Sequence, residues 1–203
     1  KLLGEPFVAM EWDGRNHQVA TITNSIVRWG RLDRNGEIVT ALADKFTPAA
    51  GQRYVRAWMS RRGSSIYWAL YKDVDSGGAF SESRVVFART SLTGTVEVAA
   101  TEVTGGNLAA PAQEIRITTD SDTNSHLFYR PWATRAFQAN AFQTNAFQTA
   151  NISQTMQYIR VNASGTVLAG PSAPFTAAPG SDEMAPAAAL LDNSDNVPLV
   201  AYT

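Results

Sequence analysis

The chain of 203 residues contains no cysteine. This absence excludes disulfide bonds, thiolate zinc sites and a cysteine nucleophile. Charged residues make up only 17% of the sequence, which is below the usual quarter of a globular domain. The net charge of −1 provides no basic face, so neither nucleic acid nor an anionic membrane is an expected partner.

Long apolar runs and helical periodicity are also lacking. The longest apolar run, Ala185 to Leu191, is far too short to span a bilayer, and no membrane insertion is expected. No stretch has the apolar spacing of an amphipathic helix. Because the sequence begins with Lys1 and shows no signal peptide, we expect an excised or processed segment.

What the sequence does contain is an internal repeat. The stretches WGRLDRNGEIV, FARTSLTGTVE and YIRVNASGTVL align on a glycine. The shared positions are an aromatic residue (Trp29, Phe87, Tyr158), an arginine two residues later (Arg31, Arg89, Arg160) and a turn glycine (Gly36, Gly94, Gly165). β-Branched and aromatic residues on both sides of a polar turn predict a β-hairpin with a positive-φ glycine in each copy.

A second kind of hairpin alternates with these three. FVAMEWDGRNHQVATI, YVRAWMSRRGSSIYWALY, EIRITTDSDTNSHLFY and AAALLDNSDNVPLVAY each join two apolar strands through a polar turn. Recurring sets of four antiparallel strands are typical of β-propeller blades. We predict an all-β chain of about three and a half four-stranded meander modules, approximately residues 7–50, 51–110, 111–180 and the incomplete 181–203. Stacked sandwiches are the alternative, although no Greek-key crossover is evident.

The tract QYIRVNASGTVLAGPSAPFT and the following MAPAAALLDNSDNVPLVAYT resemble a repeat of secreted bacterial proteins. That repeat has the form R-V-x-x-x-G-x-x-L, then a Pro-Ala strand, an Asp/Asn-rich turn and an apolar strand ending in an aromatic residue. The resemblance implies a β-propeller array in an extracellular setting, without a fixed activity. The incomplete last module predicts that other protein chains, or the remainder of the precursor, complete the ring.

Residues 133–155 include three copies of Ala-Phe-Gln-x-x within the third module. We expect a loop insertion, because a period of five suits neither a strand nor a helix. The tract is similar to segments of tailed-phage and prophage proteins. Its aromatic residues Phe137, Phe142 and Phe147 are predicted either to contact a partner or to fold back over a blade edge.

Candidate ligand-binding side chains gather around the turn in WMSRRGSSIYW. They are Trp58, Arg61, Arg62, Tyr67 and Trp68. Exposed Trp and Arg are favoured anchors for proteins and glycans. The alternative for Trp58 and Trp68 is a place in the core between blades.

The remaining candidates favour structural roles. The repeated arginines invite comparison with the arginine cluster of sialidase-like propellers, but their equivalent places in each module predict stacking and carbonyl bonds. Asp120, Asp122 and Asn124 have Ca²⁺-loop spacing, yet Asp and Asn are also ordinary turn residues. His17 and His126 lack further ligands at zinc spacing. We therefore assign no catalytic residue, no metal and no cofactor.

These observations lead to a functional prediction with one alternative. We predict a non-enzymatic binding or structural module of a secreted, cell-surface or virion assembly that contacts protein or glycan. The alternative is part of a glycan-processing, sialidase-like propeller enzyme whose catalytic residues lie partly outside this segment.

Overall fold

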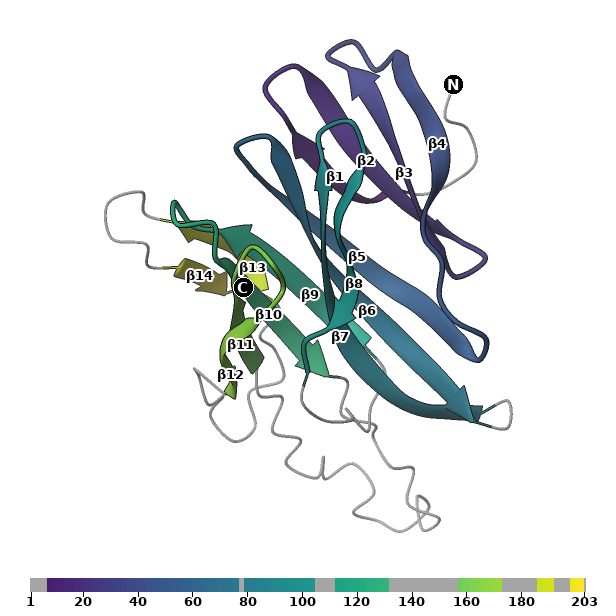
Figure 1. Ribbon diagram of the computed structural model, residues 1–203, viewed down its shortest axis with the longest axis vertical. Helices are drawn as coiled ribbons and strands as arrows, with labels where there is room; N and C mark the ends of the chain where they lie inside the picture. Colours follow the sequence, from purple (N-terminus) through teal and green to yellow (C-terminus); the bar gives the residue numbers. More distant parts are fainter. Residues whose placement is uncertain are drawn as a thin grey trace, which may run out of the picture.

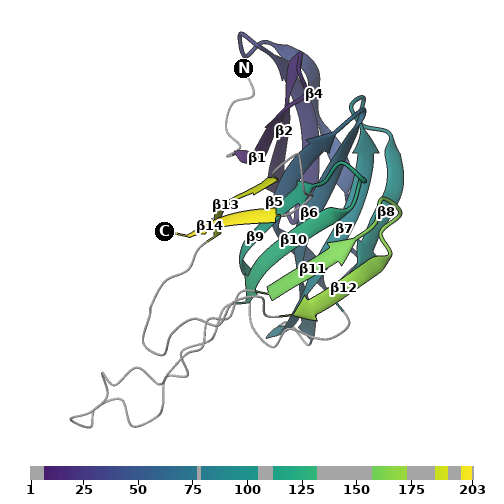
Figure 2. The ribbon, with the colours of Figure 1, turned by 90° about the vertical axis from the view of Figure 1, so that its left-hand side faces the viewer.

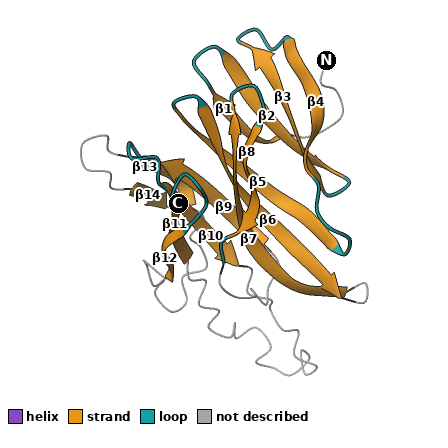
Figure 3. Cartoon of the chain, viewed as in Figure 1, coloured by secondary structure: helices purple, strands orange, loops and turns teal. Residues whose placement is uncertain are grey.

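The computed structural model describes residues 7–76, 79–104, 112–131, 157–172, 186–191 and 198–202. Every regular element in these ranges is a β-strand, and no helix occurs among them (Figure 3). Accordingly, no helix within these ranges is long and apolar enough to cross a membrane. The predicted insertion at 133–155, with Phe137, Phe142 and Phe147, lies outside the described residues.

The strands form three four-stranded antiparallel sheets, each in simple meander order (Figure 1). The first contains β1 (Phe7–Trp12), β2 (Asn16–Thr23), β3 (Ile26–Asp33) and β4 (Ile38–Phe46). The second contains β5 (Gln52–Arg62), β6 (Ser65–Ser76), β7 (Ala79–Ser91) and β8 (Val96–Glu102). The third contains β9 (Ala112–Thr119), β10 (Ser125–Pro131), β11 (Gln157–Val161) and β12 (Val167–Ser172). A separate hairpin pairs β13 (Pro186–Leu191) with β14 (Pro198–Tyr202).

The sheets are arranged like consecutive blades of a propeller (Figure 2). The first strand of each sheet lies beside the first strand of the next, so that β1 contacts β5 and β5 contacts β9. The hairpin β13–β14 continues this series, because β13 lies beside β9. The predicted all-β fold of four-stranded blade modules is confirmed.

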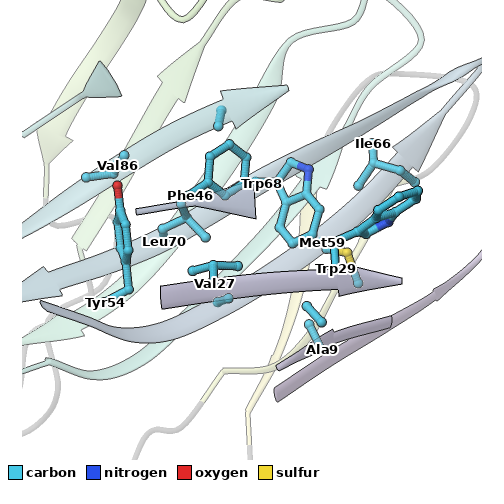
Figure 4. Packing of buried hydrophobic residues seen from close by; sticks show 13 residues of the cluster. Ala9, Val27, Trp29, Phe46, Tyr54, Met59, Ile66, Trp68, Leu70 and Val86 are labelled. Carbon is cyan, nitrogen blue, oxygen red and sulfur yellow. The ribbon is translucent and has the colours of Figure 1, made fainter. Parts of the chain in front are cut away.

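Two apolar cores hold the three sheets together. In the core between the first and second sheets, the rings of Phe46 and Trp68 meet edge to face with centroids 5.4 Å apart (Figure 4). In the core between the second and third sheets, Tyr71 and Tyr129 meet in the same way at 6.0 Å. Each blade therefore gains stability by burying its apolar faces against its neighbours rather than within itself.

The three glycine hairpins adopt the same turn. Their glycines have positive φ angles of 83° at Gly36, 85° at Gly94 and 87° at Gly165. In each turn the glycine N–H donates at 3.0 Å to the carbonyl oxygen of the opening residue, Asp33, Ser91 or Asn162. The side-chain oxygen of that opening residue accepts two further backbone N–H groups of the turn. The predicted equivalence of the three turns is therefore confirmed.

Two of the three glycine turns, those of Gly94 and Gly165, pack on the aromatic residue of the preceding sheet, a feature called here the glycine–aromatic contact. A Cβ atom added to Gly94 would lie 2.3 Å from the Trp29 ring, and one added to Gly165 would lie 3.2 Å from the Phe87 ring. A cation strengthens each contact. Lys45 Nζ donates to the Gly94 carbonyl oxygen at 2.5 Å, and Arg89 Nη1 donates to that of Ala163 at 2.9 Å.

Replacing Gly94 by alanine should destabilise the protein more than the same change at Gly36. Both sites require positive φ, which costs a non-glycine residue about 1–2 kcal/mol. Only at Gly94 does the new methyl group collide with a ring, which adds about 1–3 kcal/mol, whereas nothing lies within 4 Å of the Gly36 position. Urea unfolding of Gly94→Ala and Gly36→Ala measures the difference. Equal losses of unfolding free energy would contradict the glycine–aromatic contact.

Candidate functional site

The repeated arginines occupy the structural role predicted for them in the first two modules. Arg31 Nε donates to Thr40 Oγ1 at 2.9 Å, and its guanidinium lies 5.9 Å from the ring centroid of Trp29. Arg89 stacks in the same way over Tyr67, also at 5.9 Å. The guanidinium groups are therefore held by neighbouring rings and oxygen atoms, and the two arginines do not form a cluster like that of sialidases.

The five predicted ligand-binding residues do not form one surface. Trp68 is fully buried between the first and second sheets, which is the alternative that the sequence left open for it. Tyr67 is buried on the opposite face, against the third sheet. Trp58 is half-buried, with the Arg116 guanidinium 4.0 Å from its ring centroid. Ligand binding by any of these residues stays a prediction.

The two arginines of the same turn are the more accessible members of the set. Arg61 is exposed and Arg62 is half-buried. The backbone N–H of Arg61 donates to Glu11 Oε1 at 3.2 Å, at the adjoining ends of β5 and β1. Burial raises the pKa of Glu11, and the hydrogen bond and charge of Arg61 only partly offset that effect. A ligand role of these arginines also stays a prediction.

An open groove of about 430 Å³ runs between the second and third sheets. The second sheet contributes Arg89, Glu97 and Val98 to its walls. The third sheet contributes two turns, residues 122–124 and 162–164. Most of these side chains are polar, and two of them, Glu97 and Asp122, carry carboxylates. The sequence did not identify this groove, because its walls come from separate modules.

The wall from the second sheet is held by an ion pair. Arg89 Nε lies 3.0 Å from Glu97 Oε2, and both side chains are about one quarter exposed. Ser65 Oγ donates to the same carboxylate oxygen at 2.8 Å. Because Arg89 also bonds the Ala163 carbonyl, it links the Glu97 carboxylate to the turn on the other side of the groove.

The wall from the third sheet is built from two self-bonded turns. Asp120 Oδ1 accepts the Asn124 backbone N–H at 2.7 Å, and Thr123 has a positive φ of 65°. Asn162 Oδ1 accepts the N–H groups of Ser164 and Thr166 at 3.1 and 2.9 Å. Asp120 therefore has the turn role favoured by the sequence. In the part of the chain that the structure describes, no group of three or more His, Cys, Asp or Glu could hold a metal ion.

A buried hydrogen-bonded chain begins at Asp120, just behind this groove. His126 Nε2 lies 3.2 Å from Asp120 Oδ2, and His126 Nδ1 lies 2.8 Å from the Tyr158 hydroxyl. Burial lowers the pKa of His126, and the Asp120 carboxylate only partly offsets this. Neutral His126 consequently donates from Nε2 to Asp120 and accepts a hydrogen bond from the Tyr158 hydroxyl at Nδ1.

Burial also acts on the pKa values of the two hydrogen-bond partners of His126, Asp120 and Tyr158. Burial works to raise the pKa of Asp120, but the hydrogen bonds from Asn124 and His126 outweigh it, and the pKa lies below its ordinary value. Burial raises the pKa of Tyr158, which therefore stays a phenol. The chain is thus a neutral histidine between a carboxylate and a phenol.

The first module contains an equivalent series of hydrogen bonds, made by side chains that do not titrate near neutral pH. Gln18 faces Arg31 in the strand register, as His126 faces Arg160. Gln18 Nε2 donates to Asp13 Oδ2 at 2.5 Å, and Gln18 Oε1 accepts from Trp29 Nε1 at 2.8 Å. Asp–Gln–Trp in one blade and Asp–His–Tyr in another therefore fill one structural position.

The first module suggests a substitution that should make the third less sensitive to acid. In His126→Gln, the carboxamide can donate to Asp120 and accept from Tyr158, as Gln18 does in its own chain. The pKa of His126 is lower in the folded protein than in the unfolded chain. As the pH falls below about 6.5, the unfolded chain therefore binds a proton before the folded protein does, and the free energy of unfolding decreases. The variant should match the wild type at neutral pH and lose less stability by about pH 5.5, with a difference of at most about 1.4 kcal/mol for each pH unit below the unfolded pKa.

Urea unfolding at both pH values measures this effect. His17 is present in both proteins and does not enter the comparison. Identical losses of stability in the wild type and in His126→Gln would show that His126 does not titrate differently in the two states.

Comparison with known proteins identifies the class of fold. No protein-family model and no curated protein matches the chain. A solved ulvan lyase of family PL25, bound to -[GlcA(1-4)Rha3S]-, aligns with a TM-score of 0.50 at 12% identity. It covers 79% of this chain and 41% of its own. Xylan β-1,4-xylosidase from Bacillus halodurans C-125 aligns with a TM-score of 0.52 at 12% identity, covering 86% of this chain and 33% of its own.

At this level of identity the likeness shows the fold, and the chain is an all-β protein of propeller type. It spans well under half the length of these two proteins. These two proteins, a polysaccharide lyase and a xylosidase, are both glycan-processing enzymes. This finding contradicts the predicted non-enzymatic binding or structural module and favours the glycan-processing alternative.

Proposed function

We propose that the protein is part of a glycan-processing enzyme and that the groove between the second and third sheets binds the glycan. The observation that carries the proposal is the presence of two carboxylates, Glu97 and Asp122, on walls contributed by different blades. A pair of carboxylates on either side of a glycosidic bond is the usual apparatus for its hydrolysis. The volume of about 430 Å³ lies in the range of small-molecule sites.

The ion pair bears on the part that Glu97 could play. Glu97 Oε2 lies 3.0 Å from Arg89 Nε, and we assign Glu97 the part of base or nucleophile. Asp122, on the wall from the third sheet, is the second carboxylate of the proposed pair. Thr123, Asn124 and Ser164 offer hydrogen-bonding groups suited to sugar hydroxyls.

The fold supports the proposal at the level of architecture. Ulvan lyase and xylan β-1,4-xylosidase share the arrangement of strands with this chain. Their substrates are properties of those proteins and enter here only as members of a test panel. A polymeric glycan substrate, together with the resemblance to repeats of secreted bacterial proteins, favours an extracellular place of action.

Substitutions of the two carboxylates test the proposed function. Glu97→Gln and Asp122→Asn should each reduce glycan cleavage by about 100-fold or more, because acid–base groups commonly contribute that much. Asp44→Asn is the matched control, because Asp44 is an exposed carboxylate paired with Arg28 in the first sheet. The assay measures release of reducing ends from xylan and from uronate-containing polysaccharides, with circular dichroism as a check on folding.

The products also separate two reaction types. Hydrolysis yields new reducing ends without a double bond, whereas elimination yields an unsaturated uronyl end that absorbs ultraviolet light. Cleavage that persists in both carboxylate variants would reject the assigned roles. If the wild-type protein cleaves none of these polysaccharides, the proposed enzymatic function is contradicted.

A further inference from the structure

The charges on the walls of the groove are mostly negative. Of the described residues that line it, Arg89 is the one cation, whereas Glu97 and Asp122 carry carboxylates. One positive and two negative formal charges leave the walls with a formal charge of −1. An anionic sugar that entered the groove would therefore meet charges of its own sign, and such repulsion is one way in which a site rejects a ligand.

The positive charge of Arg89 is already compensated by the protein. Its Nε lies 3.0 Å from Glu97 Oε2, and its Nη1 donates to the Ala163 carbonyl oxygen at 2.9 Å. Its guanidinium carbon lies 5.9 Å from the ring centroid of Tyr67. A sugar carboxylate bound to Arg89 would lie beside Glu97, so that two anions would share one cation. Arg89 is therefore poorly suited to hold an acidic sugar.

A further carboxylate lies behind the wall from the third sheet. Asp120 is 3% exposed, and its oxygens accept hydrogen bonds from Asn124 and His126. Burial raises the pKa of Asp120, but these hydrogen bonds outweigh it, and the pKa lies below its ordinary value. Burial lowers the pKa of His126, so its ring is neutral near pH 7 and does not offset the charge of Asp120. Asp120 thus adds to the negative potential at the turn of residues 122–124.

Arg160 carries a positive charge on the third sheet, but on its other face. Its neighbours in β11, Ile159 and Val161, are buried in the core between the second and third sheets. Successive side chains of a strand point to opposite faces of the sheet. Arg160 is exposed and consequently faces away from the second sheet and from the groove.

The polar side chains of the groove suit the hydroxyl groups of an uncharged sugar. Asn162 Oδ1 accepts hydrogen bonds within its own turn, and Asn124 Nδ2 donates to Asp120 Oδ2 at 3.1 Å. Among the described residues, Asn162 Nδ2 and Asn124 Oδ1 have no hydrogen-bond partner. The two turns therefore present one donor and one acceptor. A sugar hydroxyl, which both donates and accepts, can bond to both.

We infer that the groove takes an uncharged glycan and cleaves it by hydrolysis, an inference that rests on the proposed function and names the substrate class of the same site. The oxygen of a water molecule bonds to the anomeric carbon, and the glycosidic carbon–oxygen bond breaks. One of the two carboxylates takes a proton from the water, and the other delivers a proton to the leaving oxygen.

Elimination makes a different demand on the site. A base removes the proton on the carbon beside the uronate carboxylate, the bond to the leaving oxygen breaks, and a carbon–carbon double bond forms. Negative charge develops at the uronate carboxylate and requires a positive group or hydrogen-bond donors to stabilise it. In this groove that carboxylate would lie near Glu97 and Asp122, while Arg89 is paired with Glu97. Hydrolysis of an uncharged sugar avoids this repulsion.

A panel of polysaccharides of opposite charge character tests the inference on the intact chain. The neutral members are xylan, arabinan, galactan and mannan, and the acidic members are polygalacturonate and alginate. At least one neutral polysaccharide should release reducing ends at least about tenfold faster than either acidic one. The products should lack the ultraviolet absorbance of an unsaturated uronyl end.

A charge variant separates the effect of charge from the effect of shape. Ser164→Lys adds a cation at an exposed position of the groove, and Ser164→Gln is the matched uncharged control. In a calorimeter at low salt, trigalacturonate should bind several-fold more tightly to Ser164→Lys than to Ser164→Gln. The difference should shrink at high salt, because salt screens exposed charges. Circular dichroism checks that both variants fold.

The outcomes distinguish this inference from the proposed function. Faster cleavage of an acidic polysaccharide, or unsaturated products, would overturn the inference and leave the enzymatic function in place. Equal binding of trigalacturonate to the two Ser164 variants would also overturn it. If neither class of polysaccharide is cleaved, the proposed function fails and the inference fails with it.

Discussion

The contact between a glycine turn and the aromatic ring of the preceding sheet is the constraint on which the arrangement of blades depends. The ring and the glycine of one repeat do not touch each other. Trp29 touches Gly94, and Phe87 touches Gly165, each in the following module. A motif that looks local in the sequence therefore encodes two halves of two different interfaces, and its fixed internal spacing keeps both in register.

Turn chemistry was the part of the fold that the sequence could predict. Gly36, Gly94 and Gly165 are tied to their hairpins by neighbours a few residues away, so their conformation can be read locally. Burial was harder to predict in the second sheet. Strand β6 is buried on both faces from Ile66 to Asp73, because it lies between two other sheets. Alternation of apolar and polar residues is absent there, so the sequence did not show that Tyr67 and Trp68 are both buried.

The groove was beyond what the sequence could predict, and a glycan-processing role entered only as the alternative. Glu97 belongs to the second module and Asp122 to the third, and only the packing of two blades brings them to one space. Neither lies in a recognisable catalytic motif. The predicted non-enzymatic role rested on the absence of such motifs. A site whose residues come from separate blades has no contiguous sequence motif.

The shared chain of Asp, a polar residue and an aromatic residue has a consequence for how such a protein can change. In the first blade the middle residue is Gln18 and in the third it is His126, while the hydrogen bonds keep the same pattern. One scaffold position therefore accepts either a permanently neutral amide or an ionisable ring. Duplicated blades can diverge in their response to acidity by a single residue exchange, while the backbone that holds the exchanged residue stays as it was.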